Sequence, residues 1–371
     1  MSSLDKIAKA GFIVFLGMGF ERFFSYFFRV LVARAGVEVY GLYSLSMSLV
    51  LTLVSLSMLG LTDGLVRFVS FHAGRGNQEG VNRIVSSTLK VVLPVSIFFM
   101  LAVFLFSHNL SSFFSEPRLS LVLKFFSLLI PVMVLINVYS GVNVAYKRME
   151  YVVFSKNIFA GVLRIILLLF FLYLGFSLTG VLIAHLLSFI LALICLAYFT
   201  RRLITFTLVK GFDKELLSYS WPLMFTAVTL GLTERVDTLM IAYFRDTVDV
   251  ALYNTAYPTA ALMFIASTAI LSIFFPTITG KYAKKQSIRG DYKSVTRWIF
   301  TINLPIAAIM IFYSRELLTF LFTREYIAAS YALSLLGFVF FTESFIRPSI
   351  GVLMMLKKTK FILYIVILRF L

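Results

Sequence analysis

Long apolar stretches dominate the chain, and polar residues gather in short segments between them. Each stretch is roughly 20 residues long, the length that an α-helix needs to cross a bilayer. Apolar and polar residues do not alternate as in barrel strands, so we expect helices, whose backbone hydrogen bonds are satisfied within the segment. The pattern predicts spans at residues 10–32, 41–61, 89–106, 122–142, 154–174, 178–199, 220–242, 255–275, 295–313 and 329–356, and another beginning at Phe361.

The composition supports a membrane protein. Of the 371 residues, 60% are hydrophobic and only 14% are charged, whereas soluble domains average about 25% charged. Little sequence remains for a soluble catalytic domain, and the one cysteine, Cys195, lies within an apolar stretch, where it is best explained as core filler. We therefore expect an all-α polytopic membrane protein.

The basic residues indicate the orientation. Lys and Arg number 34 against 17 Asp and Glu, and most of them fall in alternate loops, including Lys6, Arg75, Arg148, Arg201 and Lys284. Because Lys and Arg collect in cytoplasmic loops, we expect the N-terminus inside and a location in the cell (cytoplasmic) membrane. The same rule explains the basic character of the chain without a nucleic acid partner.

An internal repeat divides the chain. Residues 40–43 (Tyr-Gly-Leu-Tyr) recur as residues 250–253 (Val-Ala-Leu-Tyr), and Leu-Pro at 93–94 recurs at 304–305. Six spans separate the copies, so both halves share one orientation, as in parallel-repeat transporters. We expect an N-terminal lobe at 1–200, a cytoplasmic linker at 201–219 and a C-terminal lobe at 220–371 with four to five spans. On this repeat the second lobe stops about forty residues short, which favours a fragment.

Charged residues inside the predicted spans are candidate functional groups, because each costs roughly 2.5–3.5 kcal/mol to insert. One hypothesis is a hydrophilic cavity between the halves, where arginines bind a phosphate or pyrophosphate bidentately. The other is that the carboxylates neutralise the arginines or lock the halves together. His185 is expected to be an interior histidine bonded to a neighbouring helix. The candidates are the arginines Arg22, Arg29, Arg235, Arg164 and Arg347, and the charge partners or coupling-ion ligands Glu21, Glu234, Asp237 and Glu343.

Motifs for enzymatic chemistry are absent from the sequence. It contains no phosphate-binding glycine loop with Lys-Ser/Thr, no His-Glu-x-x-His and no Cys-x-x-Cys, and its three histidines are scattered. We therefore expect no catalytic residues, no metal site, no cofactor and no enzyme activity.

Several segments resemble one family of transporters. Ala33-Arg34, the Tyr-Gly-Leu-Tyr segment at 40–43, residues 235–241 and Phe275-Pro276 are similar to the polysaccharide-export flippases, the O-unit flippase branch of the multidrug/oligosaccharidyl-lipid/polysaccharide exporter superfamily. The resemblance implies two six-helix lobes around a V-shaped central cavity, and alternating access that flips a lipid-linked oligosaccharide. The chain departs from the family pattern at Ala251, where glycine is usual, and lacks the final helices.

The resulting functional hypothesis is a flippase that translocates a polyprenyl- or dolichyl-(pyro)phosphate-linked glycan for surface polysaccharide synthesis. Its partners would be this lipid-linked glycan, the bilayer and a coupling cation, Na⁺ or H⁺, and we expect a monomer. One alternative is a cation-coupled multidrug antiporter of the same superfamily, in which Glu234 and Asp237 would be the working groups. A second alternative is a membrane-embedded glycan polymerase or ligase.

Overall fold

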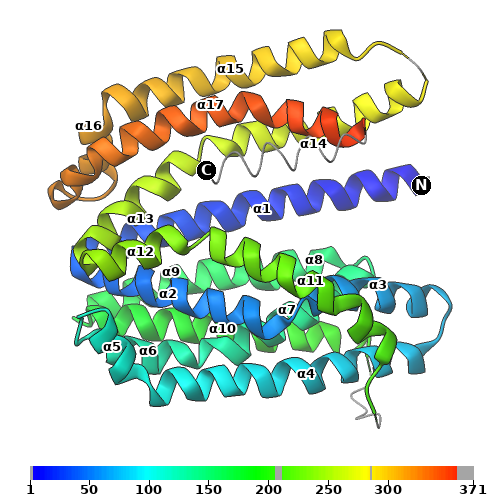
Figure 1. Cartoon of the computed structure of the whole chain (residues 1–371), viewed down its shortest axis with the longest axis horizontal. Coiled ribbons are helices and arrows are strands. Elements are labelled where there is room, and N and C mark those ends of the chain that lie inside the picture. The colour runs from blue at the N-terminus through cyan, green and yellow to red at the C-terminus, as the bar shows by residue number, and fades with distance from the viewer. Residues whose placement is uncertain (1–2, 205–210, 285, 357–371) are drawn as a thin grey trace. The chain divides into compact units, whose positions relative to one another are not determined.

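The protein is helical throughout the part of the chain that the computed structural model describes, residues 3–204, 211–284 and 286–356 (Figure 1). The first predicted span lies within one 32-residue helix, α1 (Ser3–Arg34). The span predicted from Phe361 lies outside the described residues. Nine helical segments of the described part are long and apolar enough to cross a membrane: Val37–Met58, Gln78–Leu105, Leu119–Ala145, Met149–Tyr173, Leu178–Thr200, Lys214–Thr233, Thr247–Tyr282, Arg289–Phe312 and Arg324–Leu353.

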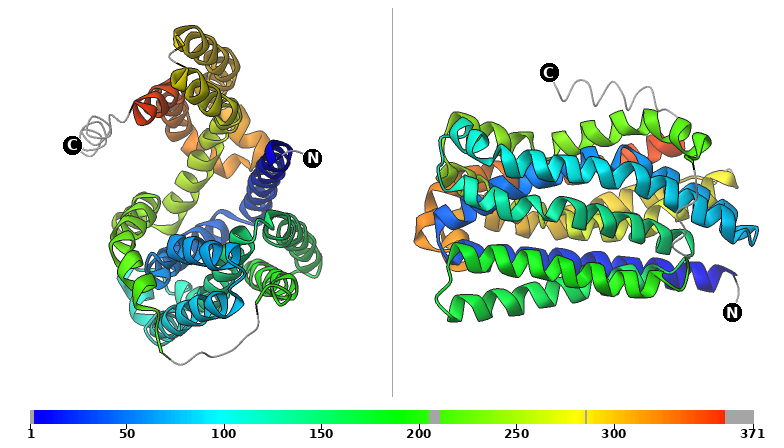
Figure 2. Two further views of the ribbon diagram at one scale, coloured as in Figure 1. Left: turned by 90° about the vertical axis from the view of Figure 1, so that its right-hand side faces the viewer. Right: turned by 90° about the horizontal axis from the view of Figure 1, so that it is seen from below.

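The chain forms two compact units, Met1–Ala251 and Leu252–Leu371. Unit 1 holds the helices up to α12 and the first turn of α13. Its helices lie side by side with roughly parallel axes (Figures 1 and 2). After α1 they are α2 (Val37–Met58), α3 (Leu61–Gly74), α4 (Gln78–Leu105), α5 (Ser107–Phe113), α6 (Leu119–Ser127), α7 (Leu129–Ala145), α8 (Met149–Val152), the π-helix η1 (Val153–Phe159), α9 (Ala160–Tyr173), α10 (Leu178–Thr200), α11 (Lys214–Thr233) and α12 (Val236–Phe244).

Helices α2 and α7 form the centre of unit 1. Helix α2 packs against α4, α6 and α7, and α7 also contacts α3 and α10. Polar groups join the helices inside this core: the Asn143 side chain on α7 donates to the Thr200 hydroxyl on α10 at 2.7 Å, and both residues are fully buried. Because α11 and α12 pack against α2, unit 1 ends later than the lobe predicted at 1–200. The lobes are defined by the repeat, and their boundaries stay a prediction.

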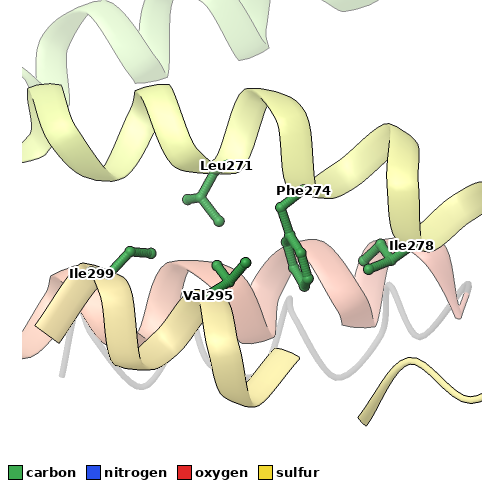
Figure 3. Close-up of a cluster of buried hydrophobic side chains, with 5 residues drawn as sticks. All are labelled: Leu271, Phe274, Ile278, Val295 and Ile299. Atoms are coloured by element: carbon green, nitrogen blue, oxygen red, sulfur yellow. The ribbon is translucent and has the colours of Figure 1, made fainter. Parts of the chain in front are cut away.

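Unit 2 is built around α15. It contains most of α13 (Thr247–Ala261), α14 (Phe264–Ala283), α15 (Arg289–Phe312), α16 (Ser314–Leu321), the 3₁₀-helix η2 (Arg324–Ala329) and α17 (Ser330–Met355). Helix α15 packs against α14 and α17. Figure 3 shows their shared core, in which Leu271, Phe274 and Ile278 of α14 meet Val295 and Ile299 of α15. The spacing of three and four residues places each set on one face of its helix.

Breaks interrupt spans that the apolar pattern predicts as single helices. The span at 122–142 divides at Leu128 into α6 and α7, three residues before Pro131, which has no N–H to donate to the preceding turn. The span at 255–275 divides between α13 and α14, where Leu262 and Met263 bond three residues back, to Thr259 and Ala260. The span at 220–242 divides at Glu234-Arg235 into α11 and α12.

The order of helices repeats along the chain. Helix α1 begins at Ser3 and α11 at Lys214, α2 at Val37 and α13 at Thr247, and α4 at Gln78 and α15 at Arg289. In each copy the long helix that contains a proline, α4 or α15, is followed by a short helix, α5 or α16. The helix starts thus recur at nearly the offset of 210 that the sequence motifs give.

Candidate substrate-binding residues

Helix α1 carries a basic stripe. Arg22, Tyr26 and Arg29 follow at intervals of four and three residues, so they lie along one face of the helix. Arg22 is exposed, whereas Arg29 is half-buried. Helix α1 packs against α2, η1 and α9, and the Arg29 guanidinium hydrogen-bonds the hydroxyl of the fully buried Tyr40 on α2. The predicted residues Arg22 and Arg29 therefore lie on one face of α1 but differ in their exposure to solvent.

Arg164 joins Arg29 inside unit 1. It comes from α9, and its guanidinium carbon lies 4.5 Å from the centre of the Phe28 ring. The positive charges of Arg29 and Arg164 both interact electrostatically with the Tyr43 hydroxyl of α2. The exposed carboxylate of Glu21 interacts electrostatically with Arg164. Arg164 Nε is buried and has no hydrogen-bond partner within the described part of the chain. The structure thus brings two predicted arginines together, with one exposed carboxylate nearby.

His185 of α10 completes this group. The Tyr43 hydroxyl lies 3.4 Å from His185 Nδ1, so the histidine bonds to a neighbouring helix, as expected from the sequence. His185 is 1% exposed, and its Nε2 has no hydrogen-bond partner among the residues that the structure describes. We call Arg29, Arg164, Tyr40, Tyr43 and His185 the unit 1 arginine cluster.

Arg235 stands at the break between α11 and α12. Its Nη1 donates to the Gly231 carbonyl oxygen at 2.6 Å and lies 3.5 Å from Glu234. The Arg235 side chain is 17% exposed and that of Glu234 is 71% exposed. A helix end leaves carbonyl groups without intrahelical partners, and the arginine satisfies one of them. The predicted residue Asp237 lies in the first turn of α12, where the helix dipole stabilises a negative charge.

Arg347 and Glu343 form a pair on α17 in unit 2. Arg347 Nη2 donates to Glu343 Oε1 at 3.4 Å across one turn, as their spacing of four residues allows. The guanidinium also covers the Phe264 ring, 3.6 Å from its centre. Arg347 is therefore neutralised within its own unit, in line with the hypothesis that carboxylates balance the arginines.

Sequence reasoning missed Tyr40 and Tyr43 as polar partners of the arginines. Both belong to the repeated segment at 40–43, which was used only as a marker of the repeat. Their spacing of three residues places both rings on one side of α2, and this was the available indication. No group of three or more His, Cys, Asp or Glu residues able to hold a metal ion occurs in the described ranges.

Comparisons with known proteins place the chain. No curated protein matches it. Among solved structures, an inward-facing multidrug resistance MATE family transporter of the MOP superfamily matches at a TM-score of 0.67 and 16% identity, over 88% of this chain and 80% of that one. An outward-facing MATE transporter of the same superfamily matches at 0.59 and 18%, over 92% and 81%. A MOP superfamily transporter from Pyrococcus furiosus, described as having a binding pocket of reverse polarity that suggests a different function, matches at 0.61 and 16%, over 93% and 82%.

These structural matches show the fold, which is that of the MATE transporters. The family model that describes polysaccharide biosynthesis proteins matches residues 29–331, which is most of the chain. The chain therefore belongs to the polysaccharide biosynthesis protein family.

Proposed function

We propose that this membrane exporter translocates a lipid-linked oligosaccharide, with a polyprenyl or dolichyl (pyro)phosphate as the lipid carrier. The family match and the transporter fold support a membrane exporter or flippase. The observation that carries the substrate class is the basic stripe on α1, where exposed Arg22 and half-buried Arg29 lie seven residues apart on one face. Guanidinium groups stay charged and match phosphate oxygens bidentately, so such a stripe suits a phosphate head group.

The proposed path runs along this stripe. The phosphate first meets exposed Arg22 and then Arg29, whose guanidinium also bonds to Tyr40. Arg235 and Arg347 are engaged by Glu234 and Glu343, and on this proposal they contact the phosphate only after those pairs open. On this proposal the glycan and its phosphate cross the membrane by alternating access while the lipid tail stays in the bilayer.

The proposal includes an orientation. Within unit 1 the start of α1 and the α3–α4 turn lie at one end, and α5 lies at the other (Figure 1). The α3–α4 turn carries Arg75. At the other end Arg118 is paired with Glu38 at 2.8 Å and Glu116 at 3.5 Å. These carboxylates keep the pKa of Arg118 above its ordinary value, and they offset the positive charge there. The end that carries Arg75 is assigned to the cytoplasm, with the N-terminus.

A cation-coupled multidrug antiporter is the second candidate, because Glu234 exposes a carboxylate at the helix break, with 71% of its side chain accessible. In that case the carboxylates Glu234 and Asp237 would serve a cationic drug or a coupling Na⁺ or H⁺. The Pyrococcus furiosus transporter described above supports the view that pocket polarity, rather than fold, sets the substrate.

The test measures flipping of a fluorescent lipid-linked oligosaccharide in proteoliposomes. We expect Arg22→Ala and Arg29→Ala each to lower the flipping rate at least tenfold, since one lost charge-assisted contact of about 1.5–3 kcal/mol corresponds to a factor of ten or more. Arg22→Lys should retain part of the rate. The matched control is Arg148→Ala, which removes an exposed arginine at the α7–α8 turn. Normal flipping by the Arg22 and Arg29 variants, or efflux of a cationic dye without glycan flipping, would exclude the proposed assignment.

A further inference from the structure

The unit 1 arginine cluster has two hydrogen-bond donors without acceptors. Arg164 Nε carries a proton at any pH that a protein survives, and it is buried with no partner. Tyr43 lies 3.4 Å from His185 Nδ1. With the hydroxyl proton directed at this nitrogen, the neutral imidazole carries its own proton on Nε2. Within the described residues His185 Nε2 is likewise buried and without a partner, and in this tautomer both orphaned groups are donors.

The same region has an excess of positive charge. The positive charges of Arg29 and Arg164 both interact electrostatically with His185. The hydrogen-bond partner of Arg29 is the neutral hydroxyl of Tyr40, which does not offset its charge. Glu21 is the carboxylate that acts on Arg164, and it is exposed. Both arginines are partly buried, and a charge withdrawn from water is stabilised by a partner of opposite sign. Two guanidinium groups and two orphaned donors therefore call for a negatively charged acceptor.

The surroundings restrict the size of that acceptor. Four aromatic rings surround the imidazole of His185, with centre-to-centre distances of 5.7 Å to Phe28, 5.5 Å to Tyr43, 5.5 Å to Phe126 and 4.9 Å to Phe189. Phe28 and Phe126 are also fully buried. Such close ring packing leaves little free space around the imidazole, which favours a small acceptor over a phosphate with its four oxygens.

From these observations we infer that unit 1 binds a small monovalent anion of the chloride class between Arg164 and His185. The anion accepts hydrogen bonds from Arg164 Nε and His185 Nε2 and compensates the charge of the two arginines. This site goes beyond the proposed function, because it assigns Arg164 to a resident inorganic anion rather than to the carried phosphate. It holds the unit 1 arginine cluster together whether or not a substrate is bound.

The test uses the purified full chain in detergent, without any lipid-linked glycan, so its outcome does not depend on flipping. The midpoint of thermal unfolding is measured in sodium chloride, sodium bromide and sodium gluconate at equal ionic strength. A ligand that binds only the folded state raises this midpoint, and we expect chloride and bromide to raise it saturably by about 2–4 °C over gluconate.

Two variants remove the donors while keeping size. Arg164→Lys keeps the charge but loses the guanidinium Nε–H, and His185→Phe keeps a ring; both should lose the halide-dependent rise. The matched controls are Arg148→Lys and His108→Phe, which change exposed residues of the same types and should retain it. An equal rise in all four variants, or no difference between chloride and gluconate in the wild type, would overturn the inference.

A second measurement covers the case in which the variants do not fold. Crystals of the wild-type protein grown in bromide should show an anomalous scattering peak within hydrogen-bonding reach of Arg164 Nε and His185 Nε2. A well-defined cluster without such a peak would refute the site.

Discussion

Substitution of Gly41 tests the helix packing most sharply, because at this position α2 lies against the backbone of another helix. A methyl group at Gly41 would overlap the carbonyl oxygen of Thr247, at the start of α13. Backbone cannot rotate away as a flexible side chain can, so Gly41→Ala requires α2 and α13 to separate. Gly19 on α1 is also helical, but it is exposed and has no atom within 4 Å of an added methyl group. Gly19→Ala is therefore the matched control.

The expected difference follows from two terms. Alanine in place of glycine within a helix stabilises by roughly 0.5–1 kcal/mol, and both variants gain this term. Overpacking costs roughly 1–3 kcal/mol, and only Gly41→Ala incurs it. The two variants should thus differ by about 1–3 kcal/mol in the free energy of unfolding, or about 2–12 °C in the midpoint.

The assay is thermal unfolding of both variants in the same detergent, followed by the loss of the monodisperse peak in size-exclusion chromatography. Gly19→Ala should match or exceed the wild type, and Gly41→Ala should fall below it. Equal midpoints for the two variants would contradict the close approach of α2 and α13.

Two further predictions concern polar contacts. Thr200→Val removes the buried hydrogen bond from Asn143 and should cost about 0.6–1.7 kcal/mol, as such bonds do in membranes. Thr233→Val, whose exposed hydroxyl bonds only within α11, should cost less, and a thermal midpoint as low as that of Thr200→Val would refute this account. Asp291→Asn weakens the ion pair in which Lys281 Nζ lies 2.7 Å from the carboxylate. Both side chains are partly exposed, so we expect a loss of at most about 1 kcal/mol that vanishes in 1 M salt, and a salt-independent loss would contradict it.

The spans could be predicted from sequence because hydropathy and length act locally. A segment of about 20 apolar residues has few alternatives to a helix in a bilayer. The observed helix α10 follows the range predicted at 178–199 closely, whereas α4 begins at Gln78, well before the span predicted at 89–106. The helix starts recur at nearly the offset of the sequence motifs, and the two parallel six-helix repeats stay a prediction. The breaks were not predicted, because the apolar pattern continues through Leu128 and Leu262. At Glu234-Arg235 the charged pair gave an indication, and the arginine satisfies a carbonyl that the break exposes.

The candidate site was predicted only in part. The cost of burying charge drew attention to Arg29 and Arg164, and the structure brings them together. Their partners could not be predicted, because Tyr43 and His185 are 142 residues apart and no local pattern encodes that contact. The Arg347–Glu343 pair, by contrast, follows from a spacing of four residues, because side chains one helical turn apart meet whatever the tertiary fold.

The most direct test of the proposed activity compares two lipids in proteoliposomes that contain the wild-type chain. One is an oligosaccharide linked to a polyprenyl chain through pyrophosphate, and the other is the same glycan on a neutral lipid of equal length. The proposed role of the α1 arginines predicts rapid transfer of the pyrophosphate lipid and transfer of the neutral lipid at the rate of empty liposomes. Equal rates for both lipids, or no transfer of either, would contradict a flippase that recognises its substrate by phosphate.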